Sequence, residues 1–506
     1  MHPRTYNFVR SLGAGYFAIA VNIAYTVASV PLALHYLGKE QFGLWALAQQ
    51  IMGYLILLDL GVSSAVSRFI ADYKDDVNGG GYGSLLLTGA IVFAIQGLII
   101  AIVGVAFSSF APALFAVPEH LASDFTNILT IIITLAGISV ALRTLGAPLW
   151  AFQRMDVSYA LGSLTLLTSL AGLWGGFHLG WGIYSFAVAG VPAAFICPAI
   201  TIWFCWKSGF YPTARNWGRP RWPLFRKIFS FGYDVVCVSL GSQLVNASQI
   251  MILSRFAGLD VAATFAIGTK AYSMFQQFTG KIIDASLPIL TEMFVQGDLE
   301  KLNQRFINVI SITAFLATLG SSILLTGNAA IIGFWTSGSI LWNTSCDTLL
   351  AVLLLANSFS RCLISVFGSM LGYRPVRYIY FLEGCMFIAL AIPATRFFGI
   401  PGILGASLLS HLLITLHLGF KQVNKVLKFS RGIIRPLVTA AVIVGCIAFF
   451  SFLFTKIPLP LIPIPVNVGI VCLTIVSAWF CIFSDSLRLD LWLKVRSLVI
   501  RQSPSR

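Results

Sequence analysis

Four basic residues lie inside long apolar segments of this chain, where an unpaired charge is costly. On a membrane-insertion scale, a Lys or Arg in the middle of such a segment costs roughly 2.5–3.5 kcal/mol, so these side chains are expected to line an internal cavity or to pair. They are Arg143, Lys270, Lys281 and Arg361. Ammonium and guanidinium groups bind anions, phosphate above all, so the four predict a cationic binding cavity.

The segment 261–290 places polar side chains on one helical face. They are separated by steps of three or four residues, and they are Lys270, Ser273, Gln277, Lys281 and Asp284. Lys270 and Lys281 are separated by roughly 16 Å along a helix axis, which predicts one cation in each half of the span. Lys281 and Asp284 are close enough to pair, so a purely structural ion pair is the alternative to a functional role.

A second polar stripe lies on the preceding segment, 229–255, and carries no charge. It consists of Ser239, Ser242, Gln243, Asn246 and Gln249, which again share one face. Amide side chains hydrogen-bond neutral polar groups of a ligand. We therefore select Gln243, Asn246 and Gln277 as the polar lining of the cavity.

Three acids inside apolar segments are candidates for ion coupling. They are Asp59, Asp284 and Glu383, and carboxylates within a membrane can relay protons. Asp234 lies near the end of its segment, where its side chain reaches the interface. The competing interpretation is that buried ion pairs hold the helices together. Because the cations outnumber the acids that stay inside, the cavity is expected to be net positive.

The composition excludes a soluble protein. Of the 506 residues, 58% are hydrophobic and 10% charged, whereas a soluble protein carries about 25% charged residues. Mean hydropathy is +0.87. The net charge of +15 is typical of the basic cytoplasmic loops of a polytopic membrane protein, so we expect no nucleic-acid partner. The nine cysteines form no CxxC pattern and predict neither a metal site nor a disulfide framework.

Apolar stretches separated by short polar breaks predict about fourteen transmembrane helices. Their approximate limits are 10–35, 42–69, 83–107, 125–149, 157–177, 181–206, 229–255, 261–290, 306–326, 347–372, 376–397, 402–420, 433–455 and 464–484. An even number places both termini on one side. If that side is the cytoplasm, the only cations on the outer side are Lys39, Arg255, Arg396 and Lys456, which favours this orientation.

An internal repeat divides the chain. Residues 36–46 align with residues 256–266 through an aromatic-x-Gly-x-acid pattern followed by an aromatic-Ala pair. We predict an all-α membrane protein with two six-helix bundles, related by a pseudo-two-fold axis along the membrane normal, and two C-terminal helices. The predicted parts are bundles at 1–206 and 229–427, a basic cytoplasmic linker at 207–228, two further helices in 428–484 and a basic tail at 485–506.

Several functions lack the residues they require. The chain has no GxxxxGK[ST] motif for ATP hydrolysis. His411 and His417 do not share a helical face and therefore predict no metal site. No outer loop is long enough for a catalytic domain. We therefore predict a secondary transporter and not an enzyme, with no cofactor and with an H⁺ or Na⁺ gradient as its energy source. The basic linker, which contains no acid, predicts contact with anionic lipids of the inner leaflet.

Two segments resemble a known family. Residues 42–46 (FGLWA), 58–61 (LDLG) and 68–71 (RFIA), and then 288–291 (PILT) and 297–301 (GDLEK), resemble the polysaccharide branch of the MOP (multidrug/oligosaccharidyl-lipid/polysaccharide) superfamily, the Wzx-type O-antigen flippases. Related lipid II flippases carry several arginines in their first two spans. Here those spans contain only Arg10 and Arg68 near their ends, so the cationic role would shift to the four cations named above.

The resemblance implies export of an undecaprenyl-pyrophosphate-linked oligosaccharide, an O-antigen or exopolysaccharide repeat unit, across the bacterial inner membrane by ion-coupled alternating access. It also implies partners among polysaccharide-assembly proteins, such as the polymerase. Two alternatives remain open. One is a multidrug/cation antiporter of the same superfamily, for which a positive cavity is unfavourable. The other is a membrane glycan polymerase or ligase.

Overall fold

The structure is a computed structural model that describes residues 3–55, 76–152, 154–371, 374–427, 431–455, 464–485 and 487–489, with five single residues between 56 and 75. The chain forms two compact units, the N-unit (Met1–Ala266) and the C-unit (Ile267–Arg506). Every regular element in the described residues is a helix, which confirms the predicted all-α membrane fold. Nine of these helical segments are long and apolar enough to cross a membrane, and three shorter apolar helices accompany them. The count of about fourteen spans, the pseudo-symmetry and the domain limits remain predictions.

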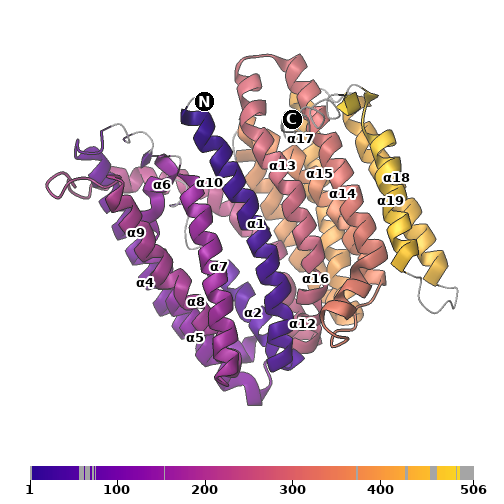
Figure 1. Ribbon diagram of the computed structural model, residues 1–506, viewed down its shortest axis with the longest axis horizontal. Coiled ribbons are helices and arrows are strands. Elements are labelled where there is room, and N and C mark those ends of the chain that lie inside the picture. The colour runs from indigo at the N-terminus through magenta and orange to yellow at the C-terminus, as the bar shows by residue number, and fades with distance from the viewer. Residues whose placement is uncertain are drawn as a thin grey trace, which may run out of the picture. The chain divides into compact units, whose positions relative to one another are not determined.

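The described elements of the N-unit are helices and short helical turns (Figure 1). Its elements are α1 (Pro3–Tyr36), α2 (Lys39–Leu55), α4 (Gly81–Leu114), α5 (Glu119–Ala141), the 3₁₀ turn η2 (Arg143–Gly146), α6 (Ala147–Ala151), α7 (Met155–His178), η3 (Gly182–Tyr184), α8 (Ser185–Val191), the π-helical η4 (Pro192–Ile196), α9 (Cys197–Lys207), α10 (Trp222–Asn246) and α11 (Ser248–Ala257). The chain passes into the C-unit within α12 (Leu259–Gly268).

The C-unit is built around long helices. They are α13 (Lys270–Val295), α14 (Leu299–Trp335), α15 (Ser345–Leu371), α16 (Arg374–Ser410), the π-helical η5 (His411–Leu416), α17 (His417–Leu427), α18 (Arg431–Thr455) and α19 (Ile464–Ile482). α16 consists of two helices joined at Gly399, which has a φ of 58°. This left-handed residue, which favours glycine, lies between the predicted spans 376–397 and 402–420.

Small residues let α4 and α5 approach closely (Figure 1). A Cβ atom on Gly137 would lie 2.7 Å from the carbonyl oxygen of Gly97, and a Cβ atom on Gly97 would overlap the carbonyl oxygen of Gly137. Gly104 faces the side chain of Ile133 in the same way. Helices in lipid associate through such close packing, because burial of apolar surface provides little driving force there.

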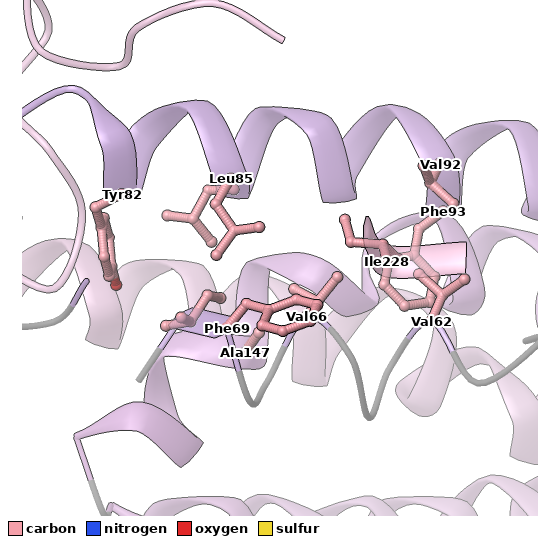
Figure 2. Close-up of a cluster of buried hydrophobic side chains, with 11 residues drawn as sticks. Val62, Val66, Phe69, Tyr82, Leu85, Val92, Phe93, Ala147 and Ile228 are labelled. Carbon is pink, nitrogen blue, oxygen red and sulfur yellow. The ribbon is translucent and has the colours of Figure 1, made fainter. Parts of the chain in front are cut away.

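A buried hydrophobic cluster anchors the start of α4 (Figure 2). The loop after α9 packs on this cluster, since Tyr82 Oη donates to the carbonyl oxygen of Phe210 at 2.9 Å and Tyr211 Oη donates to that of Leu145 at 2.6 Å. Burial raises the pKa of the Tyr211 phenol above its ordinary value. Part of the predicted basic linker is therefore folded onto the N-unit.

Three predicted spans are interrupted. The span 125–149 ends as α5 at Ala141, and Tyr211 satisfies a carbonyl group freed at the following turn η2. The span 229–255 breaks at Ala247, where Asn246 Nδ2 donates back to the carbonyl oxygen of Ser242 at 2.9 Å. The span 261–290 breaks between Gly268 and the first residue of α13. At each break a side chain donates to a backbone carbonyl group, which a hydropathy pattern does not reveal; at the third, Asn328 Nδ2 donates to the carbonyl oxygen of Gly268 at 3.2 Å.

One of the segments that carry the family resemblance forms a helix start. Gly297 adopts a φ of 76°, and Asp298 caps α14 by accepting from the backbone N–H of Lys301 at 3.3 Å and from its Nζ at 2.6 Å. These hydrogen bonds hold the pKa of Asp298 below its ordinary value. The Gly-Asp pair at 297–298 therefore has a local structural role at the turn between α13 and α14.

The close approach of α4 and α5 predicts that bulk at Gly97 destabilises the N-unit. Gly97→Leu is expected to lower the free energy of unfolding by about 3 kcal/mol, because a side chain there must displace a backbone carbonyl. Gly162→Leu on α7 is the matched control, since nothing lies within 4 Å of a Cβ atom at that position. Thermal unfolding of the detergent-solubilised protein measures the effect. Equal melting temperatures for both variants would contradict the packing role.

Candidate functional site

An ion pair between Arg361 and Asp284 lies in the C-unit. Nη2 of Arg361, on α15, is 3.2 Å from both carboxylate oxygens of Asp284, on α13. The side chains are 43% and 45% exposed. A charge that faces lipid is expensive, so the exposed side of this pair is expected to face a polar space. The alternative considered from sequence, a pair between Asp284 and Lys281, is not the one that forms.

A glycine makes this ion pair possible. A Cβ atom on Gly280 would lie 2.6 Å from Nη1 and 2.7 Å from Cζ of Arg361. The guanidinium therefore lies against the backbone of α13, one turn before Asp284. The sequence analysis missed Gly280, because a single glycine inside a helix forms no pattern.

Two further polar contacts join α13 to α15 and hold the ion pair in register. Asn357 Nδ2 donates to Tyr272 Oη at 2.8 Å, and Ser358 Oγ donates to Thr279 Oγ1 at 3.2 Å. The residues of both contacts come before Asp284 in the sequence of α13 and before Arg361 in that of α15. We call these two hydrogen bonds and the ion pair the α13–α15 seam. Because the seam fixes the backbone of α15, it also fixes the position from which the guanidinium reaches across to α13.

The remaining predicted residues of α13 lie along the same helix. Lys281 directly follows Gly280, is exposed, and makes no hydrogen bond or ion pair with any residue that the structure describes. Lys270, the first residue of α13, is half-buried and likewise has no such partner in the described part of the chain. Gln277 is exposed. The structure thus brings Lys281, Arg361 and Asp284 together and leaves Lys270 roughly 16 Å away along the helix.

A buried carboxylate, that of Asp347, positions the start of α13. Asp347 accepts hydrogen bonds from Asn328 Nδ2 and Trp342 Nε1, both at 2.7 Å to the same oxygen. Asn328 Nδ2 also donates at 3.2 Å to the carbonyl oxygen of Gly268, the last residue of α12. The break between α12 and α13 is therefore satisfied by side chains of α14 and α15. The sequence analysis placed Asp347 at the edge of a span and assigned it no role.

Glu383 lies in a closed, buried network rather than in an open cavity. One of its oxygens is 2.7 Å from Nδ1 of His411, and the other accepts from Thr415 Oγ1. Nε2 of His411 lies 2.9 Å from Ser360 Oγ. All four residues are buried. The network joins α15, α16 and η5, and it ends at Ser360, the neighbour of Arg361 on α15.

The π-helical turn η5 brings His411 and Thr415 onto the same carboxylate. A π-helix inserts an extra residue into a helical turn and often marks a functional site. Here it allows two residues of one short element to contact both oxygens of Glu383. The sequence analysis considered His411 only as a metal ligand and therefore missed it. Since an acid inside an apolar segment needs a partner, a search for one could have found it.

The predicted residues of the N-unit are more dispersed. Arg143 is exposed at the first position of η2, in the turn after α5 rather than inside a continuous helix. Gln243 is half-buried, with its amide oxygen 3.4 Å from where a Cβ atom on Gly53 would lie, while Asn246 is exposed at the end of α10. Asp59 lies outside the described residues. Whether these residues share a cavity with those of α13 stays a prediction.

The fold is similar to those of solved MOP-superfamily transporters. The lipid II flippase MurJ, in an inward closed conformation, is matched over 93% of this chain and 98% of its own, with a TM-score of 0.66 and 14% identity. An inward-facing multidrug resistance MATE family transporter is matched over 80% and 95%, with a TM-score of 0.62 and 12% identity. A MOP superfamily transporter from Pyrococcus furiosus is matched over 84% and 96%, with a TM-score of 0.61 and 13% identity. At these identities the likeness shows the fold. No curated protein sequence matches the chain.

The family is shown by a sequence match. The model of a family described as polysaccharide biosynthesis protein matches residues 14–294, more than half of the chain. This range includes the first segment of the resemblance and the start of the second. The match confirms the predicted relationship to polysaccharide-synthesis proteins, and the likeness to MOP-superfamily transporters shows a similar fold. The chain belongs to the polysaccharide biosynthesis protein family.

Proposed function

We propose that this protein is a flippase that moves an undecaprenyl-pyrophosphate-linked oligosaccharide, such as an O-antigen repeat unit of lipopolysaccharide or an exopolysaccharide unit, from the cytoplasmic to the periplasmic face of the bacterial inner membrane. Both termini are proposed to be cytoplasmic. The observation that carries the proposal is the exposed guanidinium of Arg361, which lies against Gly280 beside Lys281 in a membrane-spanning part of a polysaccharide biosynthesis protein.

The pyrophosphate is the part of this substrate that the cations suit. Arg361 uses one nitrogen for Asp284, so its other N–H groups remain for phosphate oxygens. Lys281, the residue after Gly280, adds a second positive charge. Lys270 lies roughly 16 Å further along α13, which is about half of a hydrocarbon core of about 30 Å. The two lysines therefore provide successive positions for an anion that crosses the membrane.

The sugars and the polyprenyl chain of the proposed substrate require environments without positive charge. Neutral amides hydrogen-bond hydroxyl groups without selecting a charge, which is the role proposed for Gln243, Asn246 and Gln277. The polyprenyl chain is proposed to stay in the bilayer, since its burial in a polar cavity would be unfavourable. The exposed arginines of the loop after α9, which include Arg215 and Arg219, are proposed to contact anionic lipids. The polymerase that uses the exported unit is a proposed partner.

Ion coupling is proposed to use the buried pair of Glu383 and His411. A carboxylate and an imidazole at 2.7 Å can hold either one or two protons while keeping their hydrogen bond. The neutral hydroxyls of Ser360 and Thr415 contact this pair, and the Tyr272 phenol is a further titratable group close to Glu383. Because Ser360 precedes Arg361, a change of protonation is transmitted to the pyrophosphate site through one peptide unit of α15.

Export is expected to fail in Arg361→Ala. Without the guanidinium the pyrophosphate loses its main partner, and polyprenyl-linked units should accumulate on the cytoplasmic face of the membrane. The measurement is the leaflet that holds labelled lipid-linked glycans in a deletion strain complemented with each variant. Arg305→Ala removes another exposed arginine of the C-unit and is expected to export normally.

Each other outcome of this experiment points to a different function. Normal export in the deletion strain, together with drug sensitivity, would favour the multidrug antiporter. Accumulation of unpolymerised units on the outer face would favour the polymerase or ligase. Normal export in Arg361→Ala alone would remove Arg361 from the site.

A methyl group at Gly280 is expected to disturb the same site without removing a charge. In Gly280→Ala the Cβ atom would overlap the guanidinium and displace it, so export should fall by about tenfold to a hundredfold. Gly333→Ala on α14 is the matched control, because a Cβ atom there meets nothing within 4 Å. Both proteins should reach the membrane in equal amounts. Wild-type export rates in Gly280→Ala would show that the guanidinium position is unimportant.

Substitution of Glu383 is expected to uncouple export from the proton gradient. Transport by the wild type in proteoliposomes should respond to an imposed pH difference, whereas Glu383→Gln should not, because an amide cannot take up a proton. Asp347→Asn changes another buried carboxylate and should keep the response, even where it lowers stability. An unchanged pH response in Glu383→Gln would place coupling at Asp284 or Asp59.

A further inference from the structure

The ion pair of Arg361 and Asp284 differs from the other buried charges of the C-unit because it is only partly satisfied. Both oxygens of Asp284 contact a single nitrogen, Nη2, and the two side chains are 43% and 45% exposed. Nε and Nη1 of Arg361 make no hydrogen bond with any residue in the described part of the chain. By contrast, Glu383 is closed off by partners on both oxygens. A pair built only to join two helices would not leave most of its guanidinium donors open.

Asp284 is the partner that can move. The two hydrogen bonds of the α13–α15 seam and Gly280 determine where the guanidinium lies, whereas the Asp284 side chain is 45% exposed and contacts only Nη2 of Arg361 among the described residues. A second cation is within its reach, because Lys281 lies three residues earlier on the same helix and makes no ion pair with a described residue. A rotation of the Asp284 side chain would therefore exchange one cation for another, with no change in the helix backbone.

A carboxylate and a phosphate compete for the same guanidinium, since both offer oxygens with the geometry of its N–H fork. We infer that Asp284 is an internal competitor for the anionic group of the substrate at Arg361. In the empty protein Asp284 holds the guanidinium, and an entering pyrophosphate displaces the carboxylate toward Lys281. Return of the carboxylate then helps to release the product. This inference rests on the proposed function, because it assumes that Arg361 binds the pyrophosphate.

The competitor also explains how the site avoids the lipids that surround it. Bilayer phospholipids carry a phosphodiester with one negative charge and are far more abundant than any polyprenyl pyrophosphate. An unpaired guanidinium open to the membrane would bind them. A singly charged phosphodiester is attracted to Arg361 no more strongly than the Asp284 carboxylate is, so it does not displace the carboxylate. A pyrophosphate carries a higher charge and does displace it. Specificity of this kind comes from raising the cost of the wrong ligand.

The test compares two probes on purified full-length protein in nanodiscs of phosphatidylcholine. The probes are farnesyl pyrophosphate and short-chain phosphatidylglycerol, and the measurement is the Kd of each. Asp284→Asn is expected to bind both probes more tightly, by about tenfold for a partly screened unit charge. The gain should be larger for phosphatidylglycerol, so that selectivity for pyrophosphate falls. Glu300→Gln removes another exposed acid, at the start of α14, and is expected to leave both Kd values unchanged.

The variant Arg361→Ala tests pyrophosphate binding at Arg361 separately from competition by Asp284. Loss of farnesyl pyrophosphate binding in Arg361→Ala, with unchanged or weaker binding in Asp284→Asn, would overturn the competitor and leave the proposed site in place. Unchanged binding in Arg361→Ala would overturn both. If Asp284→Asn does not fold, Asp284→Ser carries the same expectation, because it also removes the charge.

Discussion

The cost of an ion inside an apolar layer is the constraint that organises the C-unit. Each buried or half-buried acid described there has a defined partner. Asp347 is held by two N–H donors, Glu383 by His411 and Thr415, and Asp284 by Arg361. The first two networks are buried, and the partners of Glu383 contact both of its oxygens. The third is open on one side, and an open charge in a membrane protein is retained where a ligand or ion must reach it.

The closed and the open networks meet on one helix, α15. Asn357, Ser358 and Arg361 contact α13, and Ser360 contacts the Glu383 network, so neighbouring positions of one helix contact both. The proposed ion coupling uses this arrangement, because one helix carries residues of both sites. A carrier needs this coupling, because an ion gradient can drive transport only if ion binding and substrate binding bias the same structural element.

The sequence predicted the helices well, but it did not predict which residues contact one another between helices. Helical periodicity identified the polar face of α13 that carries Lys270, Lys281 and Asp284, because that pattern is local. It could not identify the partner of Asp284, since Arg361 is distant in the chain and reaches α13 only where Gly280 leaves room. The helix breaks were missed for a related reason. Hydropathy averages over a window, whereas a break depends on one carbonyl group and one side chain that donates a hydrogen bond to it.

The distinction between open and closed charges also bears on which predicted residues belong to a binding site. Glu383 was selected for its charge alone, yet it is buried, so in the proposed function it acts through Ser360 and α15 and not by direct contact with a large substrate. Lys281 was selected on the same grounds, and its exposure and lack of a partner among the described residues leave it available to an anion. A charged residue inside a membrane segment is therefore a candidate for a functional site. Whether its hydrogen-bonding groups are all occupied by other residues then separates a charge that stabilises the fold from one that can bind a ligand.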